Sequence, residues 1–282
     1  MKKMMACFLA VLMLLSMAAC GGSADKGQET SKAAEAASSG ASEEGAEESD
    51  MAYVKEKGVL VVGVTDFAPM DYLDESGEWI GFDADMARAF AERLGVEVEF
   101  VQIEWKNKLM EIEGMTVDCL WNGMTLTPDV TEALSCSNAY CNNAQIVIVP
   151  ADQADKYQTE ESLKELSFAV ESGSAGYEAA VSLGLNYTEV QSQADALMEV
   201  AAKTSDAAII DSLMAAAMVG EGTSYEDLTY TIGLVDEEYG VGFRKGSDLA
   251  EELNQFFKEA YEDGSMMECA EKYGVQAAII EQ

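Results

Sequence analysis

The side chains that could do chemistry in this 282-residue chain are carboxylates, lysines, tyrosines and cysteines, because the sequence contains no histidine. The missing histidine excludes Ser-His-Asp and Cys-His nucleophile pairs and zinc sites that mix cysteine with histidine. No CxxC pattern suggests a metal site. A general acid or base would have to be a carboxylate such as Asp66, Asp71 or Asp211, and no recognisable pairing joins them. We therefore expect no catalytic residue, no metal and no cofactor.

Polar residues that suit ligand binding follow apolar runs at four places along the chain. These are Asp66-Phe67, residues 122–127, residues 172–176 and Asp211. Ligands of open α/β sheets bind outside the carboxyl ends of the strands, so we expect the four segments to meet. A carboxylate such as Asp211, at the end of an apolar strand, needs a cationic partner. The alternative is that Asp211 caps a helix beginning at Ser212.

Strand-like and helix-like patterns alternate from residue 53 onward. Residues 58–64 (GVLVVGV) and 145–150 (QIVIVP) are apolar runs, typical of strands buried on both faces of a parallel sheet. Residues 83–94 have the apolar spacing of an amphipathic helix, and Gly95 suits its end. This alternation predicts an α/β protein with mostly parallel sheets flanked by helices.

The first 20 residues have the pattern of an export signal. Residues 1–3 (MKK) carry two lysines, and residues 6–19 form an apolar run too short to span a bilayer comfortably. Small residues precede Cys20, which resembles a bacterial lipobox, where the cysteine is lipidated and becomes the new N-terminus. The alternative is a plain secretory signal with an incidental Cys20. We expect residues 1–20 to be a lipoprotein signal peptide and Cys20 to anchor the chain on the extracellular or periplasmic side of the membrane.

The chain is strongly acidic, with 52 Asp and Glu residues against 17 Lys and Arg, for a net charge of −35. Such a field repels phosphates, which argues against a nucleic-acid partner. Residues 21–52 are rich in Ser, Gly, Ala and Glu and have almost no large apolar side chain. They cannot bury enough surface to fold, so we expect a disordered acidic tether.

Four cysteines follow Cys20 in the sequence. Cys119 lies in an apolar strand-like run and Cys269 in a helical pattern, which suits buried thiols. Cys136 and Cys141 are close enough in sequence to pair, and exported proteins can form disulfides. The pattern favours unpaired thiols at both positions.

Five motifs in the same order resemble the family-3 extracellular solute-binding proteins, the amino-acid receptors of ABC importers. They are FAPM (67–70), GEWIGFDAD (77–85), WNGMTLTP (121–128), DAAIID (206–211) and EYGVGFRKG (238–246). Together they cover the chain from about residue 58 onward. The resemblance implies a two-lobed, periplasmic-binding-protein-like fold of type II that closes on a ligand about a hinge. Lobe 1 would comprise residues 53–143 and 237–282, and lobe 2 residues 144–236.

The resemblance also implies partners and site residues. The partners would be a small amino acid or amine, an ABC transporter permease and the membrane, with the protein itself a monomer. Aromatic side chains would enclose the ligand's side chain, and an acid, a hydroxyl and a carbonyl would bind its ammonium group. The matching residues are Phe67 and Trp105 as aromatics, Asp211, Thr125 and Gly123 for the ammonium, with Asn122 and Ser174 beside them. Phe67 and Trp105 could instead be core aromatics.

The sequence departs from the family where the ligand's α-carboxylate would bind. The family usually places an arginine a few residues after Thr-Pro, and this chain has Val130; Ala175 likewise replaces a hydroxyl residue after Ser174. Ser174 and helix N–H groups, aided by Lys106 or Lys108, could bind the carboxylate instead. Otherwise the ligand is an amine without an α-carboxylate. The alternative function is a dehydratase-like enzyme on the same fold that acts through carboxylates.

Overall fold

The computed structural model describes residues 49–282. The expected signal peptide 1–20, Cys20 and most of the expected tether 21–52 lie outside these residues. Within the described part of the chain, no helix is both long enough and apolar enough to cross a membrane.

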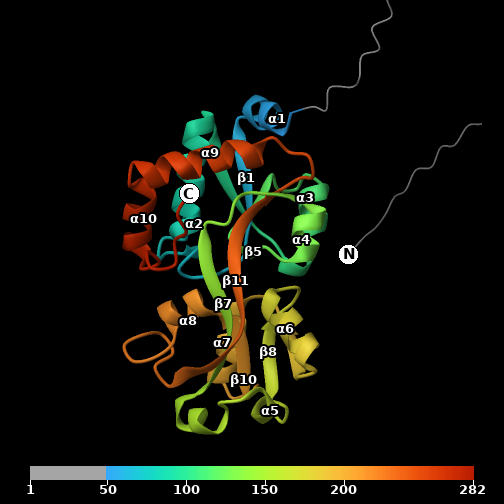
Figure 1. Cartoon of the computed structure of the whole chain (residues 1–282), viewed down its shortest axis with the longest axis vertical. Coiled ribbons are helices and arrows are strands. Elements are labelled where there is room, and N and C mark those ends of the chain that lie inside the picture. Colours follow the sequence, from blue (N-terminus) through green and yellow to red (C-terminus); the bar gives the residue numbers. More distant parts are fainter. Residues whose placement is uncertain (1–48) are drawn as a thin grey trace, which may run out of the picture. The chain divides into compact units, whose positions relative to one another are not determined.

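A nine-stranded mixed sheet runs through the described residues (Figure 1). Its strands are β1 (Val59–Val64), β4 (Glu97–Gln102), β5 (Cys119–Thr125), β6 (Ser135–Cys136), β7 (Cys141–Pro150), β8 (Ser167–Glu171), β9 (Asn186–Val190), β10 (Ala207–Asp211) and β11 (Leu228–Phe243). The hydrogen-bonded order is β4-β1-β5-β11-β7-β10-β8-β9, with β6 also paired to β11. Strands β2 (Tyr72–Leu73) and β3 (Trp79–Ile80) form a separate antiparallel pair.

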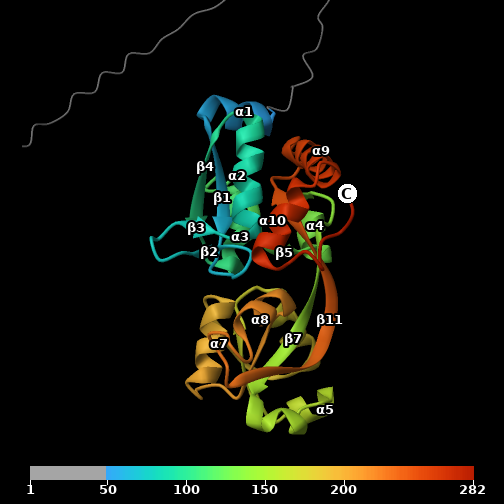
Figure 2. The same ribbon diagram turned by 90° about the vertical axis from the view of Figure 1, so that its left-hand side faces the viewer.

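Two parallel groups of strands are joined by two long antiparallel strands. Strands β4, β1 and β5 are parallel to one another, and so are β10, β8 and β9. Strands β7 and β11 pair with each other along most of their length, and each also pairs with one parallel group. The parallel groups expected from the sequence are therefore present, and β7 and β11 link them into one sheet. They also carry the chain between the groups (Figures 1 and 2).

Helices cover each group of strands. They are α1 (Asp50–Lys57), α2 (Phe82–Leu94), α3 (Lys108–Glu113), α4 (Pro128–Ala133), α5 (Glu160–Leu163), α6 (Ala175–Leu183), α7 (Gln193–Ala201), α8 (Ser212–Met218), α9 (Leu249–Glu262) and α10 (Ser265–Tyr273), with 3-10 turns η1 (Trp105–Asn107) and η2 (Ala151–Lys156). Helices α2, α9 and α10 pack around the first group, and α6, α7 and α8 around the second (Figures 1 and 2). The helix expected at 83–94 is confirmed, with Gly95 as its left-handed cap.

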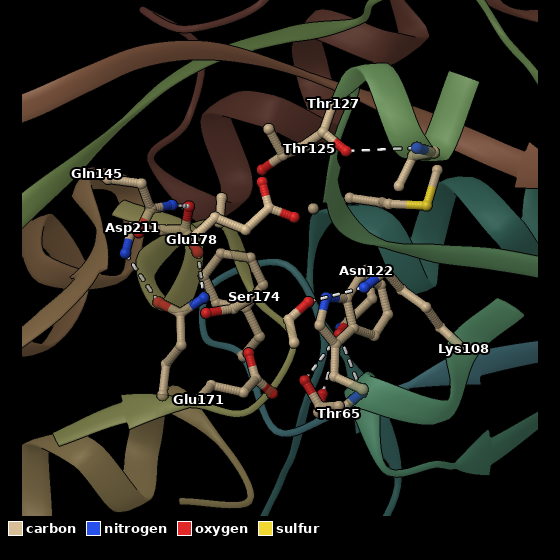
Figure 3. A pocket seen from close by; sticks show the side chains of 18 residues that line it. Thr65, Lys108, Asn122, Thr125, Thr127, Gln145, Glu171, Ser174, Glu178 and Asp211 are labelled. Carbon is tan, nitrogen blue, oxygen red and sulfur yellow. Dashed lines mark hydrogen bonds between the residues drawn. The ribbon is translucent and has the colours of Figure 1, made fainter. Parts of the chain in front are cut away.

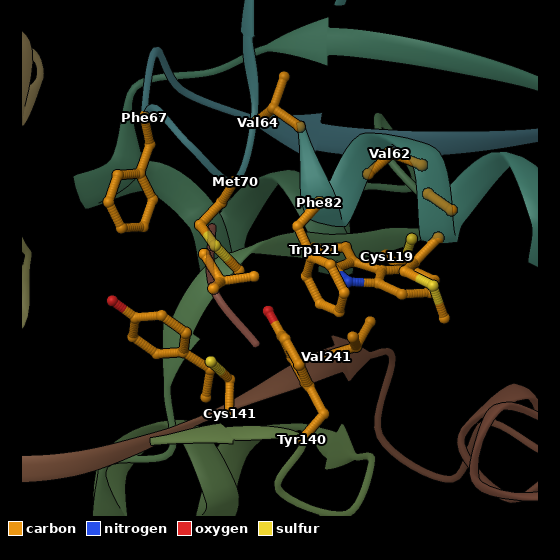
Figure 4. Close-up of a cluster of buried hydrophobic side chains, with 14 of the residues drawn as sticks. Val62, Val64, Phe67, Met70, Phe82, Cys119, Trp121, Tyr140, Cys141 and Val241 are labelled. Carbon is orange, nitrogen blue, oxygen red and sulfur yellow. The ribbon is translucent and has the colours of Figure 1, made fainter. Parts of the chain in front are cut away.

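Apolar side chains pack on both faces of the sheet, which explains why its parallel strands are continuous apolar runs. On β1, Val62 belongs to a large core with Trp121, shown in Figure 4, whereas Val61 faces a second core. On β8, Ala169 and Phe168 alternate in the same way between two cores. Burial on both faces is the arrangement that parallel sheets require.

A buried carboxylate fixes the end of β5 beside the start of α2. Asp83 accepts hydrogen bonds from the Tyr140 hydroxyl at 2.7 Å and from the Gly123 backbone N–H at 2.7 Å. Burial raises the pKa of Asp83 to about 7, although both hydrogen bonds act to lower it. The end of β5 is thereby held in a defined place, which matters because it carries Asn122 and Gly123.

The folded unit begins earlier than the sequence pattern indicates. Helix α1 starts at Asp50, and the Ser49 hydroxyl caps it by accepting from the Ala52 N–H at 3.0 Å. Asp50 pairs with Arg244 at 3.0 Å, close to the end of β11. The expectation that residues 49–52 belong to a disordered tether is therefore wrong, because long-range contacts stabilise this short helix.

The four cysteines in residues 49–282 are unpaired. Cys119 and Cys141 are buried, and Cys136 and Cys269 are partly buried. The pairing of Cys136 with Cys141, which the sequence left open, is not formed in the structure.

Candidate functional site

A pocket lies where the carboxyl ends of strands from both parallel groups meet (Figure 3). All seven predicted ligand-binding residues line it: Phe67, Trp105, Asn122, Gly123, Thr125, Ser174 and Asp211. The enclosed space is about 30 Å³, room for about two water molecules. A ligand of amino-acid size can therefore enter only if the two sides of the pocket move apart. Ligand contact by the seven residues stays a prediction.

Asn122 and Gly123, at the end of β5, form part of one wall. Asn122 Oδ1 accepts from the Thr65 N–H at 2.9 Å and hydroxyl at 2.8 Å, and its amide group donates to Asp71 at 2.8 Å. Gly123 has a φ of +53°, and a Cβ there would lie 2.3 Å from the Phe67 ring. Only glycine fits this backbone and this contact, so Gly123 sets how closely Phe67 approaches β5.

Phe67 and Trp105 contribute aromatic surface to the pocket and also pack in the core. The Phe67 ring meets Tyr239 edge to face, with centroids 6.2 Å apart. Trp105 is only 7% exposed, and the Lys108 amine lies 5.2 Å from its ring centroid. Both residues are therefore core aromatics that also line the pocket, and the reading that they enclose a ligand's side chain stays a prediction.

The segment around Thr127 forms an apolar part of the wall. The Thr127 hydroxyl caps α4 by accepting from the Val130 N–H at 3.3 Å, and Pro128 and Asp129 follow in the first turn, an arrangement typical of a helix start. Val130 is buried and lines the pocket. The position where the family's arginine was expected therefore faces the site and presents only hydrocarbon to it.

Ser174 and Ala175 bring the start of α6 to the pocket. Ser174 caps this helix, and its hydroxyl oxygen accepts from the Tyr177 N–H at 3.1 Å. Its hydroxyl hydrogen remains available to the pocket. Ala175 lines the pocket as the first residue of α6 and brings no polar side-chain atom.

Asp211 is oriented by three side-chain amides. Its carboxylate accepts hydrogen bonds from Gln145 at 2.7 Å and also from Asn143 and Gln193. Asp211 is also the N-cap residue of α8, which begins at Ser212 as the alternative reading predicts, but within the described residues its side chain makes no capping hydrogen bond. Burial raises the pKa of Asp211 well above its usual range, and the Glu237 carboxylate raises it further.

Glu171 is a second buried carboxyl group of the pocket, and sequence reasoning missed it. It is the last residue of β8 and is 3% exposed. Its Oε1 atom has no hydrogen-bond partner within residues 49–282. Burial raises the pKa of Glu171 to about 8, although the Lys108 amine acts to lower it. Its place at the end of an apolar strand, the same signal that marked Asp211, could have identified it.

Lys108 is the pocket lysine, whereas Lys106 faces elsewhere. The Lys108 amine donates to the Gly173 carbonyl at 2.7 Å, and burial lowers its pKa. Lys106 pairs with Glu104 at 3.1 Å and does not line the pocket. Of the two lysines considered from the sequence, Lys108 alone can reach a ligand in this pocket.

The sequence-family model for the bacterial extracellular solute-binding proteins, family 3, matches residues 60–276 of this chain. The chain belongs to this family. The match covers both groups of strands and all seven predicted ligand-binding residues, so the resemblance drawn from the five motifs is confirmed. The family is mainly one of solute-binding proteins.

Two curated relatives show how the family varies in function. The arginine-binding extracellular protein ArtP of Bacillus subtilis is 27% identical over 223 residues, which is 76% of this chain and 85% of ArtP. The cyclohexadienyl dehydratase of Pseudomonas aeruginosa is 29% identical over 121 residues, which is 43% of this chain and 45% of the enzyme. The dehydratase shows that an enzyme exists among the relatives of this family-3 protein.

Solved structures confirm the fold. A mutant of ArgBP from T. maritima superposes with a TM-score of 0.73 at 28% identity, covering 79% of this chain and 98% of that one. The two-lobed type II fold expected from the motifs is therefore confirmed for this family-3 protein.

The pocket of this family-3 protein is rich in carboxyl groups. Asp211, Glu171 and Glu178 line it, and Lys108 is the cationic side chain among the lining residues. Residues 49–282 contain no cluster of three or more Cys, Asp or Glu side chains that could hold a metal ion. The arrangement suits a small molecule with a cationic group better than an anion.

Proposed function

We propose that this protein captures a small amino acid or a related amine for an ABC importer by closing two lobes around it. The observation that carries the proposal is Asp211, a buried carboxylate held by three amides in a pocket lined from both groups of strands. A buried carboxylate fixed in this way is a ready partner for an ammonium group. The arginine-binding name of the relative ArtP supports the same ligand class.

The pocket's position supports closure about β7 and β11. The lobes would comprise residues 53–143 with 237–282, and residues 144–236; α1 extends the first lobe back to Ser49. Opening is required because the enclosed space of about 30 Å³ is too small for an amino acid. A permease that recognises the closed form would then accept loaded protein in preference to empty protein. We also propose that Cys20 carries a lipid that anchors the protein, as a monomer, on the outer side of the membrane.

Lys108 and the start of α6 are the candidates for the ligand's α-carboxylate. Val130 offers no charge, whereas the Lys108 amine and the Ser174 hydroxyl both face the pocket. If these groups bind a carboxylate, they take over the role of the missing arginine, although they lie on other elements than Val130. If they do not, the ligand is an amine.

A thermal-shift screen of the purified protein tests the proposal. The compounds are the α-amino acids, their decarboxylated amines and polyamines. Tight binding should raise the unfolding midpoint by mass action. A shift with α-amino acids supports a rebuilt carboxylate site, and a shift with amines alone supports an amine receptor. No shift from any compound would contradict the proposed ligand class.

Asp211→Asn tests the residue that carries the proposal. It removes the charge and turns an amide toward three amide donors, so we expect affinity to fall by about 30-fold or more. Asp155→Asn, on an exposed side chain of η2, is the matched control. The thermal unfolding midpoints of the ligand-free variants report whether each still folds. Unchanged affinity in a folded Asp211→Asn protein would contradict the binding role.

The second candidate is a dehydratase-like enzyme. Glu171 favours it, because a carboxyl group with a pKa of about 8 holds a proton at neutral pH and could act as a general acid. We favour a binding protein and expect any ligand to be recovered unchanged after prolonged incubation, as measured by mass spectrometry. Conversion of the ligand, abolished by Glu171→Gln, would establish the enzyme instead.

A further inference from the structure

Glu171 leaves a buried oxygen atom unpartnered on the pocket wall. Its side chain is 3% exposed and lines the pocket, and within residues 49–282 no donor reaches Oε1. Folded proteins rarely leave a buried polar atom unpaired, because its lost hydration is not replaced. An unpaired acceptor that faces a binding pocket is therefore suited to a donor brought by the ligand.

The neighbouring cation does not satisfy Glu171. The Lys108 amine acts to lower the pKa of Glu171, but it donates its hydrogen bond to the Gly173 carbonyl at 2.7 Å, and Oε1 of Glu171 has no donor within residues 49–282. Asp211 differs, because three amides already donate to its carboxylate. The two carboxyl groups thus lie in one pocket, and of the two it is Glu171 that keeps an oxygen atom, Oε1, without a donor within residues 49–282.

Acidic side chains continue outward from the pocket. Glu178 lines both the pocket and an adjoining groove of about 830 Å³, which Asp236, Glu237 and Glu238 also line. A positively charged ligand would be attracted along this path, whereas an anion would be repelled. The charge distribution favours a ligand with more than one cationic group.

We propose that Glu171 binds a second cationic group of the ligand, so that the ligand carries two basic nitrogens, as a basic amino acid or a diamine does. This rests on the proposed function, in which Asp211 binds the first nitrogen. Donation by the second nitrogen satisfies the unpaired oxygen of Glu171. A neutral analogue of the same size would leave that oxygen without a donor and would bring no compensating charge.

Matched pairs of probes test the inference by isothermal titration calorimetry on the purified protein. L-lysine is compared with L-norleucine, and L-arginine with L-citrulline, because each neutral partner keeps the size and loses the side-chain charge. Cadaverine and agmatine are the corresponding diamines without a carboxylate. We expect a basic compound to bind about 10- to 100-fold more tightly than its neutral partner. The diamines decide whether the carboxylate is required.

Glu171→Gln assigns the preference to this residue. The substitution keeps the size and removes the acidic group that can give up its proton when a cation binds beside it, so the preference for the basic partner should fall to within about threefold. Glu165→Gln, on an exposed side chain just before β8, is the control and should leave the preference intact. A thermal midpoint for each ligand-free variant confirms folding. If Glu171→Gln does not fold, equal wild-type affinities for a basic compound and its neutral partner still overturn the inference.

The outcomes separate the inference from the proposed function. Equal affinity for basic and neutral partners in the wild-type protein overturns the inference while amino-acid binding stands. An undiminished preference in folded Glu171→Gln also overturns it. If neither these probes nor the amino acids and amines of the wider screen bind, the proposed function fails, and the inference fails with it.

Discussion

Glu171 and Asp211 show how two carboxyl groups in one pocket acquire different properties. Both end a strand and both are buried, so burial raises the pKa of each. Asp211 is held by three amides, whereas Oε1 of Glu171 has no partner within residues 49–282. The held group suits a fixed contact and the unpaired group suits selection among ligands.

The raised pKa of Glu171 predicts how the stability of the ligand-free protein varies with pH. This pKa is about 8 in the folded protein, against a usual value of 4.5. Between these values the folded protein keeps a proton that the unfolded chain has lost. The free energy of unfolding should therefore fall as pH rises through this window, by up to a few kcal/mol from Glu171, and be independent of this group outside it.

Chemical denaturation at about pH 5 and about pH 8 measures the effect. Other groups also titrate, so the quantity of interest is the difference between the wild-type protein and Glu171→Gln. The variant should lose less stability over this range. Equal losses in both proteins would show that Glu171 does not hold its proton to high pH.

At the scale of elements, two turns meet across the pocket. One is η1 with the first residue of α3, residues 105–108, and the other is the turn between β8 and α6, residues 172–174. They are joined by the bond from Lys108 to the Gly173 carbonyl. Gly173 has a φ of +73°, and a Cβ there would lie 2.6 Å from Lys106 Cα. The contact therefore depends on the absence of a side chain.

Gly173→Ala should weaken ligand binding because it keeps the two turns apart. We expect a loss of about tenfold or more in affinity, measured by calorimetry. Gly184→Ala is a matched control, since Gly184 has a φ of +65° and no atom within 4 Å of an added Cβ. Both variants carry a backbone cost of about 1–2 kcal/mol in stability, but Gly184→Ala should bind normally. Equal affinities in the two variants would mean that the turns need not meet.

At the scale of the whole described chain, residues far apart in sequence hold its beginning in place. Asp50 and Asp118 both pair with Arg244, and Lys57 pairs with Asp118 at 2.6 Å. Asp248 accepts from the Met51 N–H at 2.9 Å. Because Asp118 and Arg244 are largely buried, their charges depend on these partners.

Removal of the start of α1 should destabilise the protein. A chain that begins at Tyr53, as the sequence pattern indicated, loses Asp50 and the contact to Asp248. Compared with a chain that begins at Ser49, its free energy of unfolding should be lower by about 1–3 kcal/mol. Its thermal unfolding midpoint should be lower by roughly 3–10 °C. Asp50→Ala in the longer chain should reproduce part of the loss. Identical midpoints for the two chains would mean that the first residues of α1 contribute nothing.

The local features of this protein follow from its amino-acid order. Apolar runs and helix caps are patterns of neighbouring residues, so the strands, the helix at 83–94 and its end at Gly95 were predictable. The four polar segments at strand ends also met as expected, because a parallel sheet brings the carboxyl ends of its strands to one edge. All seven predicted residues consequently line the pocket.

Only after folding is it settled which side chains surround the pocket residues and the start of α1. The amides that hold Asp211 come from β7 and α7, the pocket lysine is Lys108 rather than Lys106, and Glu171 is buried without a partner for one oxygen within residues 49–282. Likewise, α1 is stabilised by Arg244, 194 residues beyond Asp50. Hydrogen bonding and burial depend on segments that meet only after folding, and no local pattern of residues encodes them.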